Sequence, residues 1–222
     1  KMWEINQQIE YANEGIELVR PFGPFIYKHK ITSYLHHQLT EWSKDLSDKK
    51  EVGGKRSGAN YQSDLFHEFQ DTANDEITKS YNLLGHIDLD SLKEIKEHCS
   101  GYVNAYCKHP VQARTHLRER VRLTHFWINI QQERQWQPKH NHTGDLSFVI
   151  YVKQPKSNKS AVGNITFSYG ETMNWSVDDM QIKPEEKDIL IFPAWLKHQA
   201  FPFVENNQTR ITAAGNVAIM NK

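Results

Sequence analysis

Residues 136–152 read WQPKHNHTGDLSFVIYV, and this stretch joins a pair of histidines to a strand-like run. His140 and His142 are two residues apart, so on an extended backbone both side chains point to the same face. Two imidazoles on one face can bind one divalent metal ion. The apolar run at 146–152 has the length and composition of a β-strand. The stretch therefore predicts a metal site beside a strand.

The fold class follows from the segments that surround this stretch. Short strand-like runs separated by polar turns are typical of sandwiches and barrels. Such runs occupy residues 121–130, 146–153, 163–168, 188–192, 198–204 and 209–219. We expect an α+β fold in which a double-stranded β-helix (a jelly-roll, cupin-like barrel) carries an N-terminal helical layer.

Two apolar stripes at helical spacing lie in the N-terminal half. One covers residues 31–46, with Thr32 or Ser33 as its cap, and the other covers 92–106, after Asp88 or Asp90. The polar segment 49–60 predicts a surface loop, and 168–184 has no clear period and predicts a substrate-selecting loop at the pocket mouth. We expect a single domain over 1–222, with helical support and N-terminal strands in 1–120 and the barrel core in 121–222.

Composition limits the partners. The 222 residues have a formal net charge of zero and a pI near 7.3, so a nucleic acid partner is not expected. No apolar run is long enough to predict a membrane span. Cys99 and Cys107 lie about 12 Å apart on one expected helix, too far for a disulfide. Unpaired thiols favour a reducing compartment, and the expected location is the cytoplasm, or the host cytoplasm if a phage encodes the chain.

A third metal ligand has to come from a distant strand. His198 is the best candidate, because it follows the apolar strand at 188–192 after a short turn. Asp145 is a nearby carboxylate and the alternative to His142 as a ligand. The chain has 12 histidines, so the His-x-His pair could also arise by chance without any metal.

Arg210 and Thr212 form a second pair on one strand face. A guanidinium fork with a neighbouring hydroxyl suits a carboxylate buried at the end of a pocket. The alternative is an edge-strand arginine that pairs with a surface acid. Weaker candidates for a cofactor contact are Tyr151, Asn129 and Asn216, with Ser147 on the same strand face as Tyr151.

These motifs, in this order, resemble the 2-oxoglutarate and Fe(II)-dependent oxygenases, in the branch of uncharacterised and phage-type members related to the prolyl hydroxylases. The resemblance is carried by the segments at 127–155, 163–167 and 188–216. It implies Fe(II) at His140 and His198, and it implies that Arg210 holds the distal carboxylate of 2-oxoglutarate, with Thr212 alongside. It also implies a dioxygenase that uses O2 to hydroxylate a peptidyl residue such as proline or a small metabolite.

The chain departs from the usual first motif of that family, which is His-x-Asp or His-x-Glu. His142 stands at the third position, and this leaves three alternatives. The site has three histidine ligands, or Asp145 is the ligand in place of His142, or the third position carries no ligand. Spacing favours His142. Two other classes stay open: a cupin-type metal enzyme without 2-oxoglutarate, which has no need of the Arg210-x-Thr212 pair, and a non-enzymatic jelly-roll binding module.

Overall fold

The computed structural model describes residues 17–19, 23–48, 79–107, 120–156, 163–171, 178–204 and 207–220. The described chain forms two antiparallel sheets and two helices. The loop expected at 49–60 lies outside the described residues, as do residues 172–177 of the loop expected at 168–184. The single domain over 1–222 stays a prediction.

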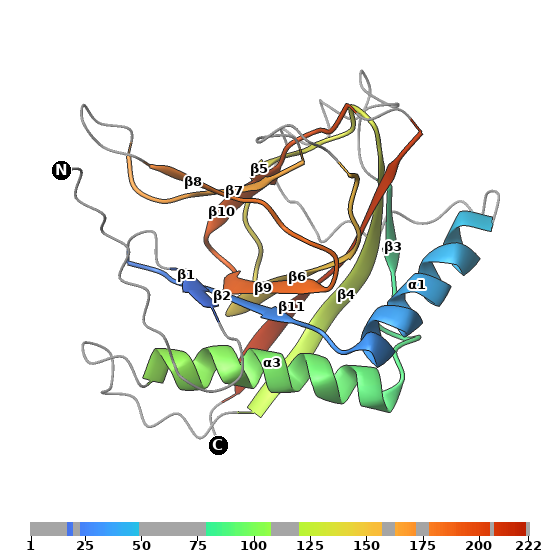
Figure 1. Ribbon diagram of the computed structural model, residues 1–222. Helices are drawn as coiled ribbons and strands as arrows, with labels where there is room; N and C mark the ends of the chain where they lie inside the picture. Colours follow the sequence, from blue (N-terminus) through green and yellow to red (C-terminus); the bar gives the residue numbers. More distant parts are fainter. Residues whose placement is uncertain are drawn as a thin grey trace.

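The larger sheet has seven strands in the order β1-β2-β9-β6-β11-β4-β3 (Figure 1). The longest pairing joins β11 to β4, and β6 flanks β11 on its other side. The N-terminal half supplies three strands to this sheet, as well as the helices. In sheet order the strands are Glu17–Val19, Ile26–Lys30, Asp188–Pro193, Leu146–Lys153, Thr209–Met220, Arg120–Gln132 and Lys79–Asn82.

The smaller sheet has four strands in the order β5-β10-β7-β8. They span Gln137–His140, Lys197–Ala200, Ile165–Ser168 and Asp179–Ile182. Apolar side chains from both sheets meet in one buried cluster, which includes Tyr151 and Phe192 from the larger sheet and Phe167 from the smaller one. The two sheets therefore face each other, as the predicted barrel requires.

The two helices begin where their caps predict. Helix α1 (Ser33–Asp48) starts after Thr32, whose Oγ1 accepts a hydrogen bond from the Leu35 amide at 3.2 Å. Helix α3 (Leu89–Cys107) starts after Asp88, whose carboxylate accepts from the Ser91 amide at 2.8 Å. Thr32 and Asp88 are thus the caps, rather than Ser33 and Asp90.

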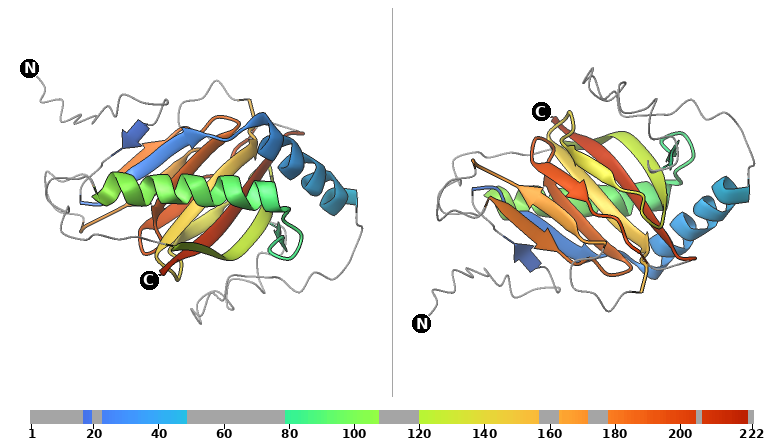
Figure 2. Two further views of the ribbon diagram at one scale, coloured as in Figure 1. Left: turned by 90° about the horizontal axis from the view of Figure 1, so that it is seen from below. Right: turned by 90° about the horizontal axis from the view of Figure 1, so that it is seen from above.

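The helices cover the face of the larger sheet that is turned away from the smaller sheet (Figure 2). Their apolar stripes enter a core with the larger sheet, in which Leu35, Ile95, Phe148 and Ile150 are almost fully buried. The chain is thus layered as helices, larger sheet and smaller sheet, and the predicted α+β class with a helical layer is confirmed. None of the described helices is long and apolar enough to cross a membrane.

Two expectations about the strands were wrong. The strand expected at 198–204 ends at Ala200, because Phe201 and Pro202 turn away to bond to the start of β7: the Phe201 amide donates to Asn164 and the Pro202 carbonyl accepts from Gly163. The segment 168–184 is not loop throughout, since β8 lies in it. This short edge strand has little apolar alternation that could reveal it.

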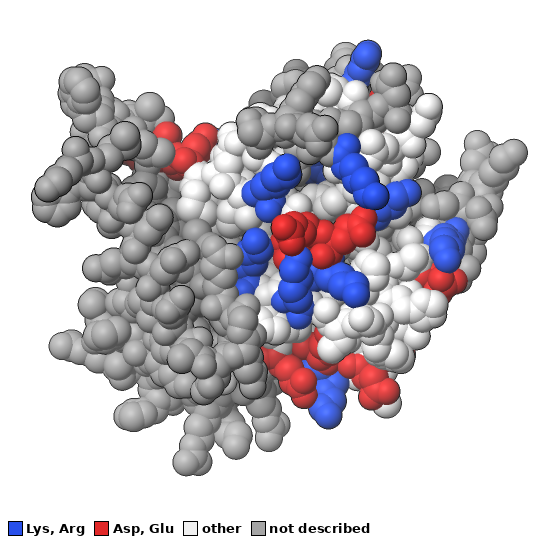
Figure 3. All heavy atoms as spheres, viewed as in Figure 1, with Lys and Arg blue, Asp and Glu red and all other residues white. Residues whose placement is uncertain are grey.

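A buried aspartate joins β2 to β9. Asp188 is fully buried, and its carboxylate lies 2.7 Å from Lys30 Nζ and 3.7 Å from Lys28 Nζ. It also accepts a hydrogen bond from the Glu185 amide at 2.7 Å. Figure 3 shows cationic side chains gathered around acidic ones in the region of β2 and β9. Charges of both signs are interspersed there, and the ion pairs of Lys28 and Lys30 with Asp188 fasten β2 to β9.

Gly215, on β11, has no room for a side chain. A Cβ at this position would lie 2.5 Å from the backbone oxygen of His125 and 2.6 Å from the Phe148 ring. We expect Gly215→Ala to lower the free energy of unfolding by about 2 kcal/mol or more, because backbone and a core ring must move apart. Chemical denaturation measures this loss. Gly85→Ala is the control, since nothing lies within 4 Å of its Cβ position, and an equal effect of both changes would contradict the packing argument.

Candidate metal centre

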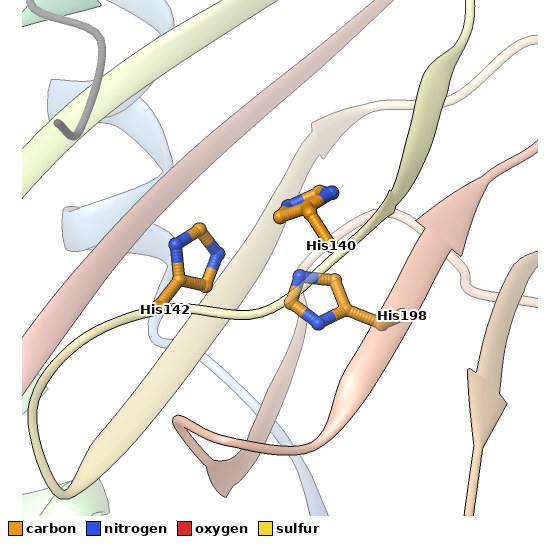
Figure 4. A group of neighbouring side chains, drawn as sticks. All are labelled: His140, His142 and His198. Atoms are coloured by element: carbon orange, nitrogen blue, oxygen red, sulfur yellow. The ribbon is translucent and has the colours of Figure 1, made fainter. Parts of the chain in front are cut away.

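Three histidines from neighbouring segments point toward one another (Figure 4). His140 is the last residue of β5, His142 lies two residues further in the following loop, and His198 lies on β10. His198 pairs directly with His140 in the register of the smaller sheet. The sheet register thus brings the distant histidine to the His-x-His pair.

The three imidazoles are close enough to share one ion. One nitrogen from each lies within 4.8 Å of the others. The ring centroids are 4.4 Å apart for His140 and His198, 4.9 Å for His140 and His142, and 5.1 Å for His142 and His198. Nitrogens that each lie about 2.0–2.2 Å from one ion are at most about 4.4 Å apart, so the rings need only a small rotation to share an ion.

Backbone carbonyls orient two of the rings. His140 Nδ1 lies 2.6 Å from the Pro138 oxygen, and His198 Nδ1 lies 3.0 Å from the Leu196 oxygen. A carbonyl can only accept, so Nδ1 carries the proton in both rings and Nε2 keeps its lone pair for a metal. Donation of the second ring N–H to a backbone carbonyl is typical of metal-bound histidines.

Burial keeps the imidazoles neutral. It lowers the pKa of His140, and it lowers the pKa of His142 to about 3, with the neighbouring His140 and His125 contributing. Burial together with His140 and His142 holds the pKa of His198 well below its ordinary value. Neutral imidazole is the form that binds a metal.

The Asp145 side chain bonds to the backbone of β11. Its carboxylate accepts a hydrogen bond from the Ile219 amide at 2.6 Å, and its own amide donates to the Val217 carbonyl at 3.0 Å. Among the described residues it is not part of the group that could hold an ion. Asp145 therefore fastens the loop that carries His142 to β11.

A cavity extends from the triad between the two sheets. Most of its described walls are apolar or carry neutral amides, and Arg210 is the one arginine or lysine among them. The lining comprises the three histidines with Trp127, Asn129, Gln131, Gln137, Phe148, Val149, Tyr151, Ile165, Phe192, Ala200, Arg210, Thr212 and Ala214. No aspartate or glutamate of the described chain lines it.

Arg210 is buried without an acidic partner among the described residues. Its side chain is at the cavity wall, and the residue is 2% exposed. One amine, Nη2, donates to the Phe201 carbonyl at 2.6 Å, the guanidinium carbon lies 5.4 Å from the centre of the Phe203 ring, and Nε has no hydrogen-bond partner in the described chain. Burial lowers the pKa of Arg210. A buried guanidinium with an unused donor is suited to binding an anion.

The remaining predicted polar residues divide into two groups. Thr212 pairs with both Tyr151 and Asn129 across β11, and the Asn129 amide donates to Thr212 Oγ1 at 3.3 Å. All three line the cavity, and Thr212 is two residues from Arg210 on β11. Burial raises the pKa of Tyr151, so its hydroxyl remains protonated. Asn216 does not line the cavity: its side chain accepts a hydrogen bond from Ser147 at 2.9 Å.

The comparisons with known proteins agree with this arrangement. Residues 125–216, which include the triad and Arg210, match the family model described as "Putative 2OG-Fe(II) oxygenase". This segment is therefore similar to the 2OG-Fe(II) oxygenases, over somewhat less than half of the chain. No curated protein matches it by sequence.

Solved structures share the fold of this oxygenase at low sequence identity. A prolyl-4-hydroxylase from Pseudomonas putida has a TM-score of 0.52 and 8% identity, over 87% of this chain and 91% of that one. AviO1 from Streptomyces viridochromogenes Tue57 has a TM-score of 0.54 and 13% identity, over 87% and 89%. A Trichoplax adhaerens prolyl hydroxylase in complex with a peptide fragment of hypoxia inducible factor has a TM-score of 0.55 and 9% identity, over 88% and 83%.

The match to this family model decides between the classes that the sequence left open. As a 2OG-Fe(II) oxygenase, the enzyme requires Fe(II) and 2-oxoglutarate, and it uses O2 and a further substrate. A cupin-type enzyme without 2-oxoglutarate and a non-enzymatic module are therefore set aside. Neutral, convergent imidazoles and an unpaired buried guanidinium fit these two groups.

Two polar wall residues of the oxygenase cavity, Gln131 and Gln137, escaped the sequence analysis. Gln131 shares a strand face with Trp127 and Asn129, so the period of two residues could have revealed it. Gln137 is three residues before His140, a spacing that puts two side chains on opposite faces of a regular strand. An irregularity in the β5–β10 register between His198 and Ala200 brings both to the cavity.

Proposed function

We propose that this oxygenase hydroxylates a peptidyl residue, with proline as the first candidate, at an iron centre held by His140, His142 and His198. The observation that supports the ligand set is the convergence of one nitrogen from each histidine within 4.8 Å. When bound, Fe(II) and 2-oxoglutarate activate O2, and the oxidative decarboxylation of 2-oxoglutarate to succinate and CO2 drives the hydroxylation.

The chain's own residues bind and orient the cosubstrate in this proposal. Arg210 binds the distal carboxylate through the donors that the Phe201 carbonyl leaves free. Thr212 and Tyr151 add hydroxyl groups beside it, and Asn129 holds Thr212 in place. Apolar walls from Phe192, Ile165 and Val149 exclude water from the reacting end.

The choice of a proline residue has two supports. Two of the solved structures with the same fold are described as prolyl hydroxylases, and one holds a peptide. In the turn that precedes β10, Trp195 is 51% exposed and lies 5.8 Å, between ring centres, from Tyr169, which is 41% exposed. Exposed aromatic rings are the surfaces on which proline-containing extended peptides pack. A small metabolite is the second candidate for the substrate.

The cytoplasmic location remains part of the proposal. The unpaired, buried thiol of Cys99 supports it.

A thermal-shift titration tests the cofactor assignment. We expect Mn(II), used anaerobically in place of Fe(II), to raise Tm, and 2-oxoglutarate to raise it further only when the metal is present. A ligand at about 100 times its Kd adds about 2.7 kcal/mol of stability, which is a shift of several degrees for a chain of this size. Glutarate, which lacks the keto group, is the control and should give a smaller shift. A metal shift without any response to 2-oxoglutarate would contradict the assignment.

Succinate formation then tests the substrate. With Fe(II), 2-oxoglutarate and O2, a proline-rich peptide should raise the rate of succinate release and gain one oxygen atom in mass. The same peptide with alanine in place of proline should do neither. If the alanine peptide is oxidised equally well, or if only small metabolites stimulate turnover, the peptidyl-proline proposal is wrong.

A further inference from the structure

Gly163 leaves room for the buried guanidinium at the end of the cavity. It lies two residues before β7 with a φ of +76°, a backbone conformation that favours glycine. A Cβ at this position would lie 3.2 Å from Arg210 Nη2, closer than such atoms ordinarily approach. The position of the guanidinium therefore depends on the absence of a side chain at residue 163.

The segment 201–203 holds the guanidinium against Gly163. The Phe201 carbonyl accepts from Arg210 Nη2, and the Phe203 ring lies under the guanidinium carbon. The Gly163 amide donates to the Pro202 carbonyl at 3.3 Å, so the same segment is tied to Gly163 itself. Arg210 is thus held on two sides, and the cavity that it lines offers space into which a displaced guanidinium can move.

The sheet register gives the direction of that movement. Phe167 pairs with His198 at the metal end, and Ile165 pairs with Ala200 further along the same strands. Gly163 continues this direction, two residues beyond Ile165 and away from the triad. A methyl group on Gly163 would therefore push the guanidinium toward the three histidines and shorten the cavity.

We propose that Gly163 sets the depth of the cosubstrate pocket and thereby its selectivity for the chain length of the 2-oxo diacid. The inference rests on the proposed role of Arg210 in binding the distal carboxylate. Gly163 is a positioning residue, because it acts through Arg210 and does not itself carry a group that binds the cosubstrate.

The test compares Gly163→Ala with the parent enzyme, both loaded with Mn(II) under anaerobic conditions. The probes are 2-oxoglutarate, its one-carbon-shorter homologue oxaloacetate, freshly prepared, and its one-carbon-longer homologue 2-oxoadipate, and Kd is measured for each. We expect Gly163→Ala to weaken 2-oxoglutarate binding about tenfold, to weaken 2-oxoadipate more, and to weaken oxaloacetate least. The Kd for Mn(II) should not change, since no metal ligand moves.

Gly170→Ala is the matched control. Gly170 also has a positive φ, +92°, but nothing lies within 4 Å of its Cβ position. This variant carries the same kind of backbone strain without a contact on Arg210, so it should bind all three diacids like the parent. An equal loss in Gly170→Ala and Gly163→Ala would overturn the proposal, because strain alone would then explain it.

A second variant covers the case in which Gly163→Ala does not fold. Phe203→Leu removes the ring under the guanidinium and keeps the backbone, so it should also weaken 2-oxoglutarate while Mn(II) binding persists. If whichever of Gly163→Ala and Phe203→Leu folds binds 2-oxoglutarate like the parent, the inference is overturned. Arg210→Ala separates this failure from that of the proposed function: if it too binds 2-oxoglutarate normally, the role of Arg210 is wrong, whereas a loss in Arg210→Ala alone rejects only the role of Gly163.

Discussion

Arg210→Ala is expected to weaken 2-oxoglutarate binding at least a hundredfold while leaving the affinity for Mn(II) unchanged. Removing one partner of a buried, hydrogen-bonded charge pair costs about 2–5 kcal/mol, and about 1.4 kcal/mol corresponds to a factor of ten in Kd. Arg210 is the one arginine or lysine in the described cavity wall, so no other guanidinium or ammonium there can take its place. Calorimetric titration of the Mn(II)-loaded enzyme with 2-oxoglutarate measures the loss.

Two further variants make this result specific. Arg122→Ala removes the same charge from an exposed position of β4 and should bind 2-oxoglutarate like the parent. Arg210→Lys keeps the charge but loses the planar fork, and it should fall between the parent and Arg210→Ala. Normal binding in Arg210→Ala, with Mn(II) bound, would place the distal carboxylate elsewhere.

The second large effect is expected at His142. His142→Ala should lower the affinity for Mn(II) about a hundredfold or more, because losing a ligand costs at least as much as losing an outer-sphere partner, for which 10–100-fold is typical. His142→Asp puts a carboxylate at the position that carries one in the usual family motif, so it should keep Mn(II) affinity within about tenfold of the parent. Metal titrations under anaerobic conditions measure both.

Asp145→Asn decides between the two candidate ligands. The asparagine keeps an oxygen for the Ile219 amide but loses the negative charge, so the loop should stay in place and metal affinity should remain close to that of the parent. His86→Ala, at an exposed histidine remote from the site in the sequence, controls for the loss of an imidazole. Strong metal binding in His142→Ala, together with its loss in Asp145→Asn, would identify Asp145 as the ligand.

The sequence predicted the parts of this fold in which apolar or polar side chains recur at the regular spacing of a strand or helix. The strand at 146–153 matches β6 in both of its bounds, because apolar side chains face a core on each side of it. His140 and His142 were recognisable from their spacing, and Arg210 and Thr212 from theirs. Arg210 and Thr212 lie on one face of β11, as the period of two residues predicts, whereas His142 lies in the loop after β5 and still reaches the triad.

Other features depend on contacts between distant segments. Nothing in the sequence near Gly163 indicates that it borders Arg210, since the two residues are distant in the chain and come together only when the two sheets face each other. The period of β6 grouped Ser147 with Tyr151, but it could not show that Ser147 bonds to Asn216 while Tyr151 lines the cavity. Gln137 was hidden by an irregular register, which is a property of two strands together.

The direct pairing of His140 with His198 has a consequence for local unfolding at the edge of the smaller sheet. β5 is an edge strand with four residues, and within the described sheet its one neighbour is β10. An ion bound to both residues would act as a cross-link between the edge and its neighbour, so β5 could not fray until the ion had left. Escape of the ion and peeling of the edge would then be one event, and the lifetime of the loaded state would report the local opening rate of this edge rather than the strength of three separate bonds.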